Sequence, residues 1–501
     1  MSPSAPDSSD RPRVEPRAIE RALAAAGLLL EVEGTLPEAA QGITDDSRAV
    51  RPGTLFVAVR GSAADGHAYL ADAAQRGAVA ALVERPGSTT LPALVVRDGR
   101  RAAAIAAAEA YGHPATALTL VGVTGTNGKT TTAGMLRHLL DAPARAAASI
   151  GTLGVLVGSA GEEMPGGAGL TTPGPVELQR VLRVLVDRGV RSVAMEVSSH
   201  SLDQRRVEGL RFDAAVFTNL TRDHLDYHGT MEAYFAAKAR LVEYLEPQGA
   251  AIVNADDPAW AALPRAGRTI TFSTAGADAD VQMRDLAFDA AGTRATLVVG
   301  GASAPVRVPL LGDFNVANAA AAVAAAHALG VSLGDIVERL ATVPQVPGRL
   351  EILRERPTVL RDYSHTPDSL ERALAAMRPF TAGRLIVVFG AGGDRDPGKR
   401  PEMGRAAEQG ADVVILTSDN PRTEDPEKIL DDIQAGMSRA PDARIEDRRA
   451  AIARALEIAG PDDVVVLAGK GHETYQIRGT TKHPFDEREI VTELWNDMVG
   501  A

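Results

Sequence analysis

Short apolar runs alternate with helix-like segments along most of this chain, and each run ends in a polar or glycine-rich tail. The first runs are LTLVGV (118–123), RSVAMEV (191–197) and FDAAVF (212–217), and the helical spacing of MEAYFAAKARLVEYL (231–245) precedes AAIVNADD. After about residue 346 the pattern restarts with RLIVVFGAGGDRD, ADVVILTSDNPR and DDVVVLAGKGHE. This alternation predicts an α/β fold of parallel sheets covered by helices, with ligands at the carboxyl ends of the strands.

The length of 501 residues exceeds what one hydrophobic core supports and predicts about three domains. Residues 1–16 are polar and Pro/Ser-rich, and we expect them to be a disordered lead-in. We expect a small N-terminal domain at 17–99, a central domain with a mostly parallel sheet of P-loop type at 100–346, and a Rossmann-like α/β domain at 347–501. The Pro/Gly-rich segment VPQVPGRL (343–350) is the expected hinge between the last two.

Composition excludes several classes of protein. Cysteine is absent, which rules out disulfides, thiolate zinc sites and a cysteine nucleophile. No apolar run approaches the roughly 20 residues of a membrane span, and no signal-peptide pattern begins the sequence, so we expect a cytoplasmic protein without membrane insertion. The formal net charge of −12 argues against nucleic acid as the partner, although local basic sites can still bind an anionic substrate.

The segment VGVTGTNGKTTT (121–132) predicts a phosphate-binding loop between a strand and a helix. Backbone N–H groups at a helix N-terminus bind anions, glycine lets the backbone approach them, lysine neutralises the outer phosphates and a following hydroxyl can bind magnesium. The loop departs from the strict Walker pattern because Val123 stands at the leading glycine position. An ordinary helix-capping turn is the alternative, and a nucleotide loop alone suits kinases, GTPases and ligases equally. The expected nucleotide contacts are Gly125, Thr126, Asn127, Gly128, Lys129, Thr130 and Thr131.

Three further features are candidates for chemistry. Glu196 ends an apolar run, where a carboxylate beside a phosphate site is a natural magnesium ligand, although a solvated loop glutamate is the simpler interpretation. The loop FTNLTRDHLDYHGT (217–230) carries His224 among other histidines and aspartates, and zinc-like, catalytic and surface interpretations all remain open. Lys238 lies in a predicted helix, where such a lysine ordinarily extends to water.

Taken together, the motifs resemble one family. GTNGKTT, MEVSSHSL, TNLTRDHLDYHGTMEAYFAAKARL, GDFNVANAAAA, PGRLE and DYSHTPDSL occur in the order found in the Mur ligase family, and the resemblance extends from about Thr44 to Asp486. Members of this family are ATP-dependent, ADP-forming, amide-forming enzymes of peptidoglycan precursor synthesis. The resemblance therefore implies ATP and two Mg²⁺ ions as cofactors, and it implies domains that bind a UDP-sugar (17–99), ATP (100–346) and an amino acid (347–501).

The resemblance also implies roles for the residues near the loop. Lys129 matches the phosphate-binding lysine, Thr130, Glu196 and His224 match magnesium ligands, and Lys238 matches a lysine that carries a carbamate. A carbamate would turn this cation into an anion able to hold the second magnesium ion. Further nucleotide-contacting positions are matched by Asn318, Arg349, Asp362 and His365, which could otherwise be a helix cap, a hinge salt bridge and turn residues.

Three tails of the last domain predict an amino-acid site. GDRDPGKRP, SDNPRTEDP and GKGHETYQ supply guanidinium, amide and carboxylate groups, which suit a zwitterion because arginine pairs with carboxylate and glutamate with ammonium. DNPR resembles the signature of the Mur ligases that add meso-diaminopimelate, and Arg422 would hold a carboxylate that lysine lacks. The expected contacts are Arg395, Asp419, Asn420, Pro421, Arg422, Gly469 and Glu473.

The acceptor would be a UDP-muramoyl-dipeptide. The segment DDSR (45–48) matches the part of the family that holds the uridine end, and LTTPGP (170–175) and LDQRRV (202–207) match segments around the muramoyl-peptide. The expected contacts are Ser47, Arg48, Thr171, Thr172, Ser198, Gln204 and Arg206. We expect a monomer whose third domain closes over the second near residue 346. The alternatives are the same ligase using L-lysine, a folylpolyglutamate synthase, and a P-loop nucleotide switch without ligase activity.

Overall fold

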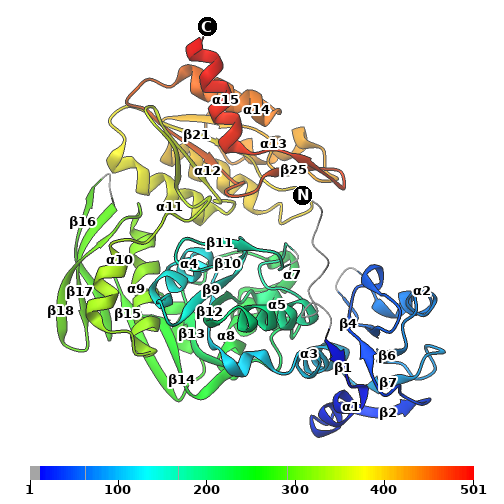
Figure 1. Cartoon of the computed structure of the whole chain (residues 1–501). Helices are drawn as coiled ribbons and strands as arrows, with labels where there is room; N and C mark the ends of the chain where they lie inside the picture. Colours follow the sequence, from blue (N-terminus) through cyan, green and yellow to red (C-terminus); the bar gives the residue numbers. More distant parts are fainter. Residues whose placement is uncertain (1–11, 62–63, 168, 290–291, 501) are drawn as a thin grey trace.

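The computed structural model describes residues 12–61, 64–167, 169–289 and 292–500, and its strands form three main sheets in chain order (Figure 1). The N-terminal sheet has five strands in the order β2-β7-β6-β5-β4, parallel except for β2. Alanines of α3 pack into the core of this N-terminal body. Its strands are β2 (Leu29–Glu33), β4 (Ile43–Thr44), β5 (Leu55–Val57), β6 (Ala80–Val83) and β7 (Ala93–Val96), with β1 (Arg13–Val14) pairing β3 (Ala40–Gln41) beside them, and its helices are α1 (Pro16–Ala25), α2 (Leu70–Gln75) and α3 (Gly99–Ala110).

The central sheet contains eleven strands in the order β11-β10-β9-β12-β8-β13-β14-β15-β16-β17-β18. The seven strands from β9 to β16 are parallel, whereas β10, β11, β17 and β18 extend the two ends as antiparallel strands. The bounds are β8 (Thr119–Thr124), β9 (Ala146–Gly151), β10 (Gly154–Val157), β11 (Glu162–Met164), β12 (Val190–Glu196), β13 (Phe212–Phe217), β14 (Leu245–Asn254), β15 (Arg268–Ser273), β16 (Val281–Asp289), β17 (Gly292–Val299) and β18 (Ala302–Val308).

Helices cover both faces of this sheet. On one face α4 (Lys129–Leu140), α9 (Asp313–Ala328) and α10 (Leu333–Leu340) share a core with the strands, and the alanines of α9 let it approach the sheet closely. On the other face lie α5 (Pro175–Asp187) and α6 (Ser199–Asp203). The short α7 (Leu225–His228) precedes α8 (Met231–Ala239), and the expected helix 231–245 continues only as a 3₁₀ turn over Arg240–Tyr244.

The C-terminal sheet has six strands in the order β19-β20-β24-β21-β22-β23, all parallel except β19. The three apolar runs that end in DRD, NPR and GHE form its centre, as expected. The strands are β19 (Glu351–Glu355), β20 (Thr358–Asp362), β21 (Leu385–Phe389), β22 (Val413–Leu416), β23 (Ala443–Arg444) and β24 (Val464–Ala468), followed by the hairpin β25 (Tyr475–Arg478) and β26 (Thr481–Pro484). The helices are α11 (Pro367–Met377), α12 (Lys399–Gly410), α13 (Pro426–Gln434), α14 (Arg448–Ile458) and α15 (Glu487–Gly500).

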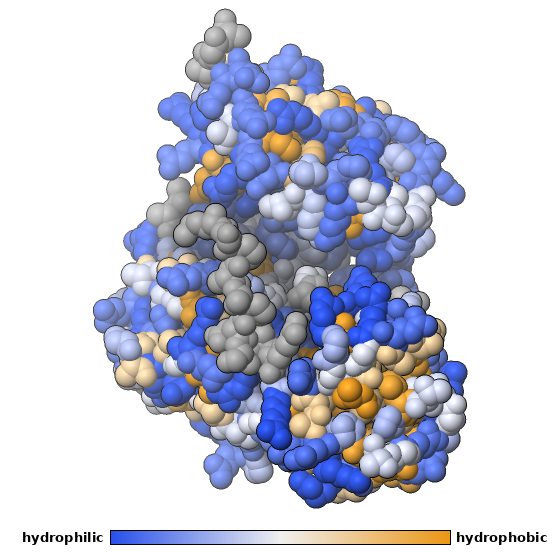
Figure 2. Space-filling model, turned by 45° about the vertical axis from the view of Figure 1, so that its right-hand side comes forward, coloured by the Kyte–Doolittle hydropathy of each residue, from blue (hydrophilic) through white to orange (hydrophobic). Residues whose placement is uncertain are grey.

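The face drawn in Figure 2 is mainly hydrophilic, with hydrophobic residues in separate patches. Large apolar side chains that are exposed are scattered along the chain, and they are Leu30, Tyr69, Leu170, Phe288 and Met498. Among the described residues, no helix combines the length and the apolar character that crossing a membrane requires. The α/β class predicted from the sequence is confirmed, and the boundaries at 99 and 346 stay predictions.

Candidate active site

The loop after β8 has the conformation that its glycines allow. Gly125 and Gly128 have φ values of 146° and 85°, a region that disfavours other residues. A Cβ atom on Gly125 would lie 1.9 Å from the hydroxyl of Thr218, and one on Gly128 would lie 2.2 Å from Oδ1 of Asn318. Glycine is therefore needed at both positions for backbone packing as well as for anion approach, and Asn318 of α9 directly supports the loop.

Two lysine amines meet at one carbonyl oxygen of this loop. The Lys129 amine donates hydrogen bonds to the carbonyls of Gly125 (2.9 Å) and Thr126 (2.8 Å), and the Lys238 amine donates to the same Gly125 carbonyl at 2.7 Å. Lys238 is only 1% exposed and lies over the Tyr234 ring at 4.4 Å, so it does not extend to water. Burial, followed by the positive charge of Lys129, lowers the pKa of Lys238 well below its ordinary 10.5. The surroundings of Lys238 therefore disfavour its charged form.

Glu196, at the end of β12, is buried and held by a single residue of the neighbouring strand end. Its carboxylate accepts hydrogen bonds from the Thr152 backbone N–H at 2.8 Å and from the Thr152 hydroxyl at 3.1 Å. The Thr152 hydroxyl also lies 3.2 Å from that of Thr171, an expected acceptor contact. Thr152 was not predicted from the sequence, yet it connects a predicted metal ligand to a predicted substrate contact.

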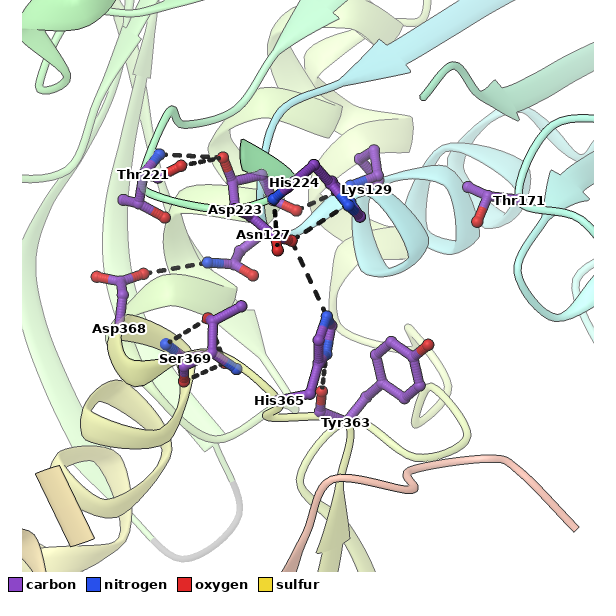
Figure 3. Close-up of polar contacts among 12 residues, drawn as sticks. Asn127, Lys129, Thr171, Thr221, Asp223, His224, Tyr363, His365, Asp368 and Ser369 are labelled. Carbon is purple, nitrogen blue, oxygen red and sulfur yellow. Dashed lines mark hydrogen bonds and ion pairs between the residues drawn. The ribbon is translucent and has the colours of Figure 1, made fainter. Parts of the chain in front are cut away.

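His224 follows β13 and takes the left-handed conformation, with φ 55°. Its ring packs edge-on to His200 at 4.8 Å, and its Nε2 lies 3.4 Å from the Asp223 carboxylate. Burial lowers the pKa of His224 more strongly than Asp223 raises it, which leaves a neutral imidazole able to bind a metal. Asp223 also faces His365 of the third domain, with 4.0 Å between the carboxylate and the imidazole (Figure 3).

In the part of the chain that the structure describes, no three His, Cys, Asp or Glu side chains are grouped so as to hold a metal ion by themselves. A magnesium ion here would take its remaining ligands from hydroxyls, water and phosphate oxygens, which is the usual arrangement for nucleotide-bound Mg²⁺. Thr130, Glu196 and His224 all line one cavity and offer the hard oxygen ligands and imidazole that such an ion accepts.

This cavity has a volume of about 550 Å³ and is lined by residues of both the central and the third domain. Arg349 donates to the Thr130 hydroxyl at 3.2 Å and stacks over the Tyr363 ring at 4.5 Å. Asn127 of the loop donates to the Asp368 carboxylate at 3.0 Å (Figure 3). Predicted residues in the lining are Thr126, Asn127, Gly128, Lys129, Thr130, Thr131, Thr171, Glu196, Ser198, His224, Lys238, Asn318, Arg349, Asp362 and His365.

Part of the cavity lining was not predicted from the sequence. Its lining includes Asn254, which ends β14, and Asp257, both in the segment NADD, together with Phe272 and Phe314. The sequence pattern that predicted the other sites, a polar segment after an apolar run, is also present here. The segment NADD was not chosen because it equally suits a simple turn. Asp257 is held in place because its carboxylate accepts the backbone N–H of Leu220 at 2.8 Å.

The predicted acceptor residues form a hydrogen-bonded set beside Glu196. The Thr172 hydroxyl donates to the Glu196 carbonyl at 2.9 Å and accepts from the Ser198 backbone N–H at 3.1 Å. Arg206 donates to the Thr172 carbonyl at 2.8 Å and to the Gln204 side-chain oxygen at 2.7 Å. These contacts place the two sequence segments LTTPGP and LDQRRV against each other.

Ser47 and Arg48 lie in a 3₁₀ turn of the N-terminal body. Arg48 is exposed and pairs with Asp46 at 2.8 Å. The neighbouring Asp45, which was not predicted as a contact, is exposed, and its carboxylate would lie 3.5 Å from a Cβ atom on Gly174 of the segment LTTPGP. The N-terminal body therefore meets the acceptor segments through Asp45.

The residues predicted to contact the amino acid are not part of the cavity lining, and several of them form a cluster of their own. We call Asp419, Asn420, Arg422, Lys470 and Glu473 the third-domain cluster. Asn420 donates to the Glu473 carboxylate at 2.8 Å, and the buried amine of Lys470 donates to Asn420 Oδ1 at 3.1 Å. Gly469, with φ 115°, lets the chain pass close to Asp419, whose carboxylate would lie 3.0 Å from a Cβ atom there.

Arg422 lies at the edge of this cluster in the left-handed conformation, with φ 52°. Its guanidinium donates to the Gly393 carbonyl at 2.7 Å, and its backbone follows the buried Pro421. Burial lowers the pKa of Arg422, and the charge of Arg395 lowers it further because the two guanidiniums lie near each other. The Asp394 carboxylate is near both guanidiniums, and the donors that it leaves free suit a ligand that carries carboxylates.

Tyr363 lines the cavity, and its ring lies 5.6 Å from the ring of His472, the residue before Glu473 of the third-domain cluster. Burial, and then the negative charge of Glu473, raise the pKa of Tyr363, while Arg349 of the cavity acts in the opposite direction. The two sites are therefore adjacent, and a reaction between a phosphorylated group in the cavity and an amine at the cluster is geometrically reasonable.

Comparison with known proteins agrees with this geometry. Family models match in three consecutive blocks, described as Mur ligase family, catalytic domain (residues 40–117), Mur ligase middle domain (123–326) and Mur ligase, glutamate ligase domain (348–471). The chain belongs to the Mur ligase family. Within that family it is 48% identical to the UDP-N-acetylmuramoyl-L-alanyl-D-glutamate--2,6-diaminopimelate ligase of Synechococcus elongatus, over 89% of this chain and 92% of the relative.

Other Mur ligases of the same name agree. The Xanthomonas campestris protein is 46% identical over 96% of this chain and 99% of its own. A solved structure of a UDP-N-acetylmuramoyl-L-alanyl-D-glutamate--2,6-diaminopimelate ligase is 35% identical, with a TM-score of 0.65 and coverage of 94% of this chain and 98% of that chain. The Mur ligase fold and membership are thus confirmed, and the roles of individual residues stay predictions.

Proposed function

We propose that this Mur ligase joins meso-diaminopimelate to UDP-N-acetylmuramoyl-L-alanyl-D-glutamate, with ATP converted to ADP and phosphate, in peptidoglycan precursor synthesis. The names of the relatives support the substrates. The observation that carries the proposal is the position of the phosphate loop, which faces third-domain residues across one cavity while two arginines and a carboxylate lie just beyond it.

The reaction requires that the acceptor carboxylate first gains a better leaving group. A free carboxylate does not react with an amine at a useful rate, so the D-glutamate carboxylate of the acceptor first attacks the γ-phosphorus of ATP. The P–O bond to ADP breaks, and an acyl phosphate forms. The diaminopimelate amine then attacks the acyl carbon, the C–O bond to phosphate breaks, and the amine loses a proton.

The residues of the cavity suit the first step. Lys129 and Arg349 both approach the hydroxyl and carbonyl groups of the loop and would neutralise charge on the transferring phosphoryl group. Thr130, Glu196 and His224 would hold magnesium, which supplies charge stabilisation when bound. Contacts such as that of Asn127 with Asp368 hold the third domain over the loop and exclude water from the acyl phosphate.

We propose further that Lys238 carries a carbamate. The neutral amine adds to CO₂, an N–C bond forms, and one proton is released, which leaves an anion. Two features support this, the low pKa of the buried amine and the close approach of the Lys129 amine to the same carbonyl. A second cation beside Lys129 is unfavourable, whereas a carbamate there would pair with Lys129 and add a ligand for a second magnesium ion.

For the amino acid, the third-domain cluster favours diaminopimelate over lysine. Glu473 offers a carboxylate to an ammonium, and the paired guanidiniums of Arg422 and Arg395 offer donors to carboxylates. Lysine would leave one of these arginines without a partner, which costs affinity. Because all reactants are small molecules and ATP is one of them, we infer that the protein acts in the cytoplasm, and we expect a monomer, which light scattering tests.

One experiment tests the proposal. The protein is incubated with ATP, Mg²⁺, UDP-muramoyl-dipeptide and either meso-diaminopimelate or L-lysine, and the product is weighed by mass spectrometry. We expect a UDP-muramoyl-tripeptide containing diaminopimelate and ADP release that requires both substrates. A lysine product formed equally well would contradict the substrate assignment, and ADP release that ignores both substrates would indicate a nucleotide switch.

A further inference from the structure

One lysine of the third-domain cluster is fully buried, and the reaction described above gives it no role. Lys470 follows β24 and Gly469, and its side chain is 0% exposed. We propose that Lys470 is a positioning residue that sets the orientation of Glu473 and Asn420 for the amine of the incoming amino acid. This inference rests on the proposed function, because it concerns the same amino-acid site.

The hydrogen bonds of Lys470 determine which way the Asn420 amide points. The Lys470 amine donates to Asn420 Oδ1 at 3.1 Å, and the backbone N–H of Ile477 donates to the same oxygen at 2.9 Å. An ammonium group can only donate, so this atom must be the amide oxygen and the other must be nitrogen. The Asn420 nitrogen consequently donates to Glu473 Oε2 at 2.8 Å.

The same ammonium holds Glu473 directly. Lys470 donates to Glu473 Oε2 at 3.3 Å, so this one oxygen receives both the lysine and the asparagine donors. Such a pair of donors fixes the carboxylate plane and leaves Oε1 for a ligand. Without the ammonium, the Ile477 N–H alone would orient the Asn420 amide, and Glu473 Oε2 would lose one of its two donors.

Charge balance supports the same role. The Lys470 amine lies 3.5 Å from Asp419 Oδ1, so two carboxylates, Asp419 and Glu473, share one buried cation. The guanidinium of Arg422, at the edge of the cluster, is near enough for the charges of the same two carboxylates to act on it. Gln476 also donates to the Asp419 carbonyl at 2.8 Å, so the backbone at this point is fixed independently of Lys470. A change at Lys470 should therefore alter side-chain orientation more than the course of the chain.

Because Lys470 is buried, it does not touch the ligand, and its influence should be confined to the step that uses the amino acid. The two half-reactions can be separated with hydroxylamine, which attacks the acyl phosphate in place of the amino acid and yields a hydroxamate. Hydroxamate formation needs ATP and the acceptor but does not need the third-domain cluster.

The test compares two substitutions. Lys470→Met roughly keeps the length of the side chain and removes its charge, and Lys428→Met makes the same exchange at an exposed lysine on α13 of the same domain. We expect Lys470→Met to raise KM for meso-diaminopimelate roughly 10- to 100-fold while hydroxamate formation stays within about twofold of the wild type. Lys428→Met should change neither quantity. In a Glu473→Gln background the added effect of Lys470→Met should shrink, because Lys470 acts through Glu473.

Three outcomes overturn the inference. The first is an unchanged KM for meso-diaminopimelate in Lys470→Met. The second is an equal loss of hydroxamate and tripeptide formation. The third is unfolding of both Lys470→Met and Lys470→Gln at the assay temperature, which would assign the ammonium to domain stability. If the wild type makes no tripeptide from meso-diaminopimelate, the proposed function itself fails, and this result is distinct from all three.

Discussion

Replacement of Arg422 by methionine should change which amino acid this enzyme prefers. The guanidinium is partly buried and spends one donor on the Gly393 carbonyl at 2.7 Å, which orients the rest of the group. The remaining donors can form a bidentate pair with a carboxylate of diaminopimelate. Loss of such a pair costs about 3 kcal/mol, which corresponds to a decrease on the order of 100-fold in kcat/KM. Lysine lacks the second carboxylate and should lose little.

The measurement is kcat/KM for meso-diaminopimelate and for L-lysine, from ADP release at saturating ATP and acceptor. The ratio of the two constants should fall on the order of 100-fold in Arg422→Met. The matched control is Arg478→Met, since Arg478 lies beside Arg422 but is 39% exposed and pairs with Glu446 at 3.0 Å. A surface pair of this kind contributes up to about 1 kcal/mol, so the ratio should hold within about fivefold. A ratio that stays constant in Arg422→Met would refute the reasoning.

Three other predictions concern the cavity and its edge. Lys129→Ala should lower hydroxamate formation by a factor on the order of 1,000, because the main cation at the outer phosphates is lost, and a rate within tenfold of the wild type would contradict this. With ¹³C-bicarbonate, NMR should detect a carbamate carbon in the wild type that is absent in Lys238→Gln, and identical spectra would count against the carbamate. Burial, and then Arg349, lower the pKa of His472 from 6.5 to about 4, so its contribution to stability is complete above pH 6.5 and is lost as the pH falls toward 4. The decrease in Tm between pH 7 and pH 5 should therefore be smaller in His472→Gln, and an equal decrease would show that His472 does not titrate in this way.

Much of the fold could be predicted because the strands that carry it are buried on both faces. Runs such as those at β8, β13 and β21 are continuous apolar segments, which is the pattern of a parallel sheet between helices. The strands β16–β18, of which β17 and β18 pair antiparallel, were not predicted. Their burial alternates or is weak, since β18 has mostly exposed and partly exposed residues, and such a pattern resembles a polar loop.

Some residues of the candidate site could likewise be predicted from the sequence, and others could not. Lys129 and Glu196 could be found because Lys129 begins the helix after a glycine loop and Glu196 ends a strand, each in a motif that suits phosphate or metal binding. Thr152 and Lys470 could not be found, because their importance lies in hydrogen bonds to residues far away in the sequence. The state of Lys238 is a similar case, since only the packing around it reveals an amine that is buried rather than solvated.

Arg448 has a consequence for how such an enzyme can diverge. This fully buried guanidinium donates to the carbonyls of Ala468 at 2.9 Å and Ser418 at 3.4 Å, and it pairs with Glu487 at 2.7 Å. The ends of β22 and β24 are thereby tied together from below, away from Arg422 at the rim. Substitutions at the rim can therefore accumulate without destabilising the loops that follow β22 and β24. A descendant could acquire a different amino-acid preference through one or two substitutions while it keeps the same fold.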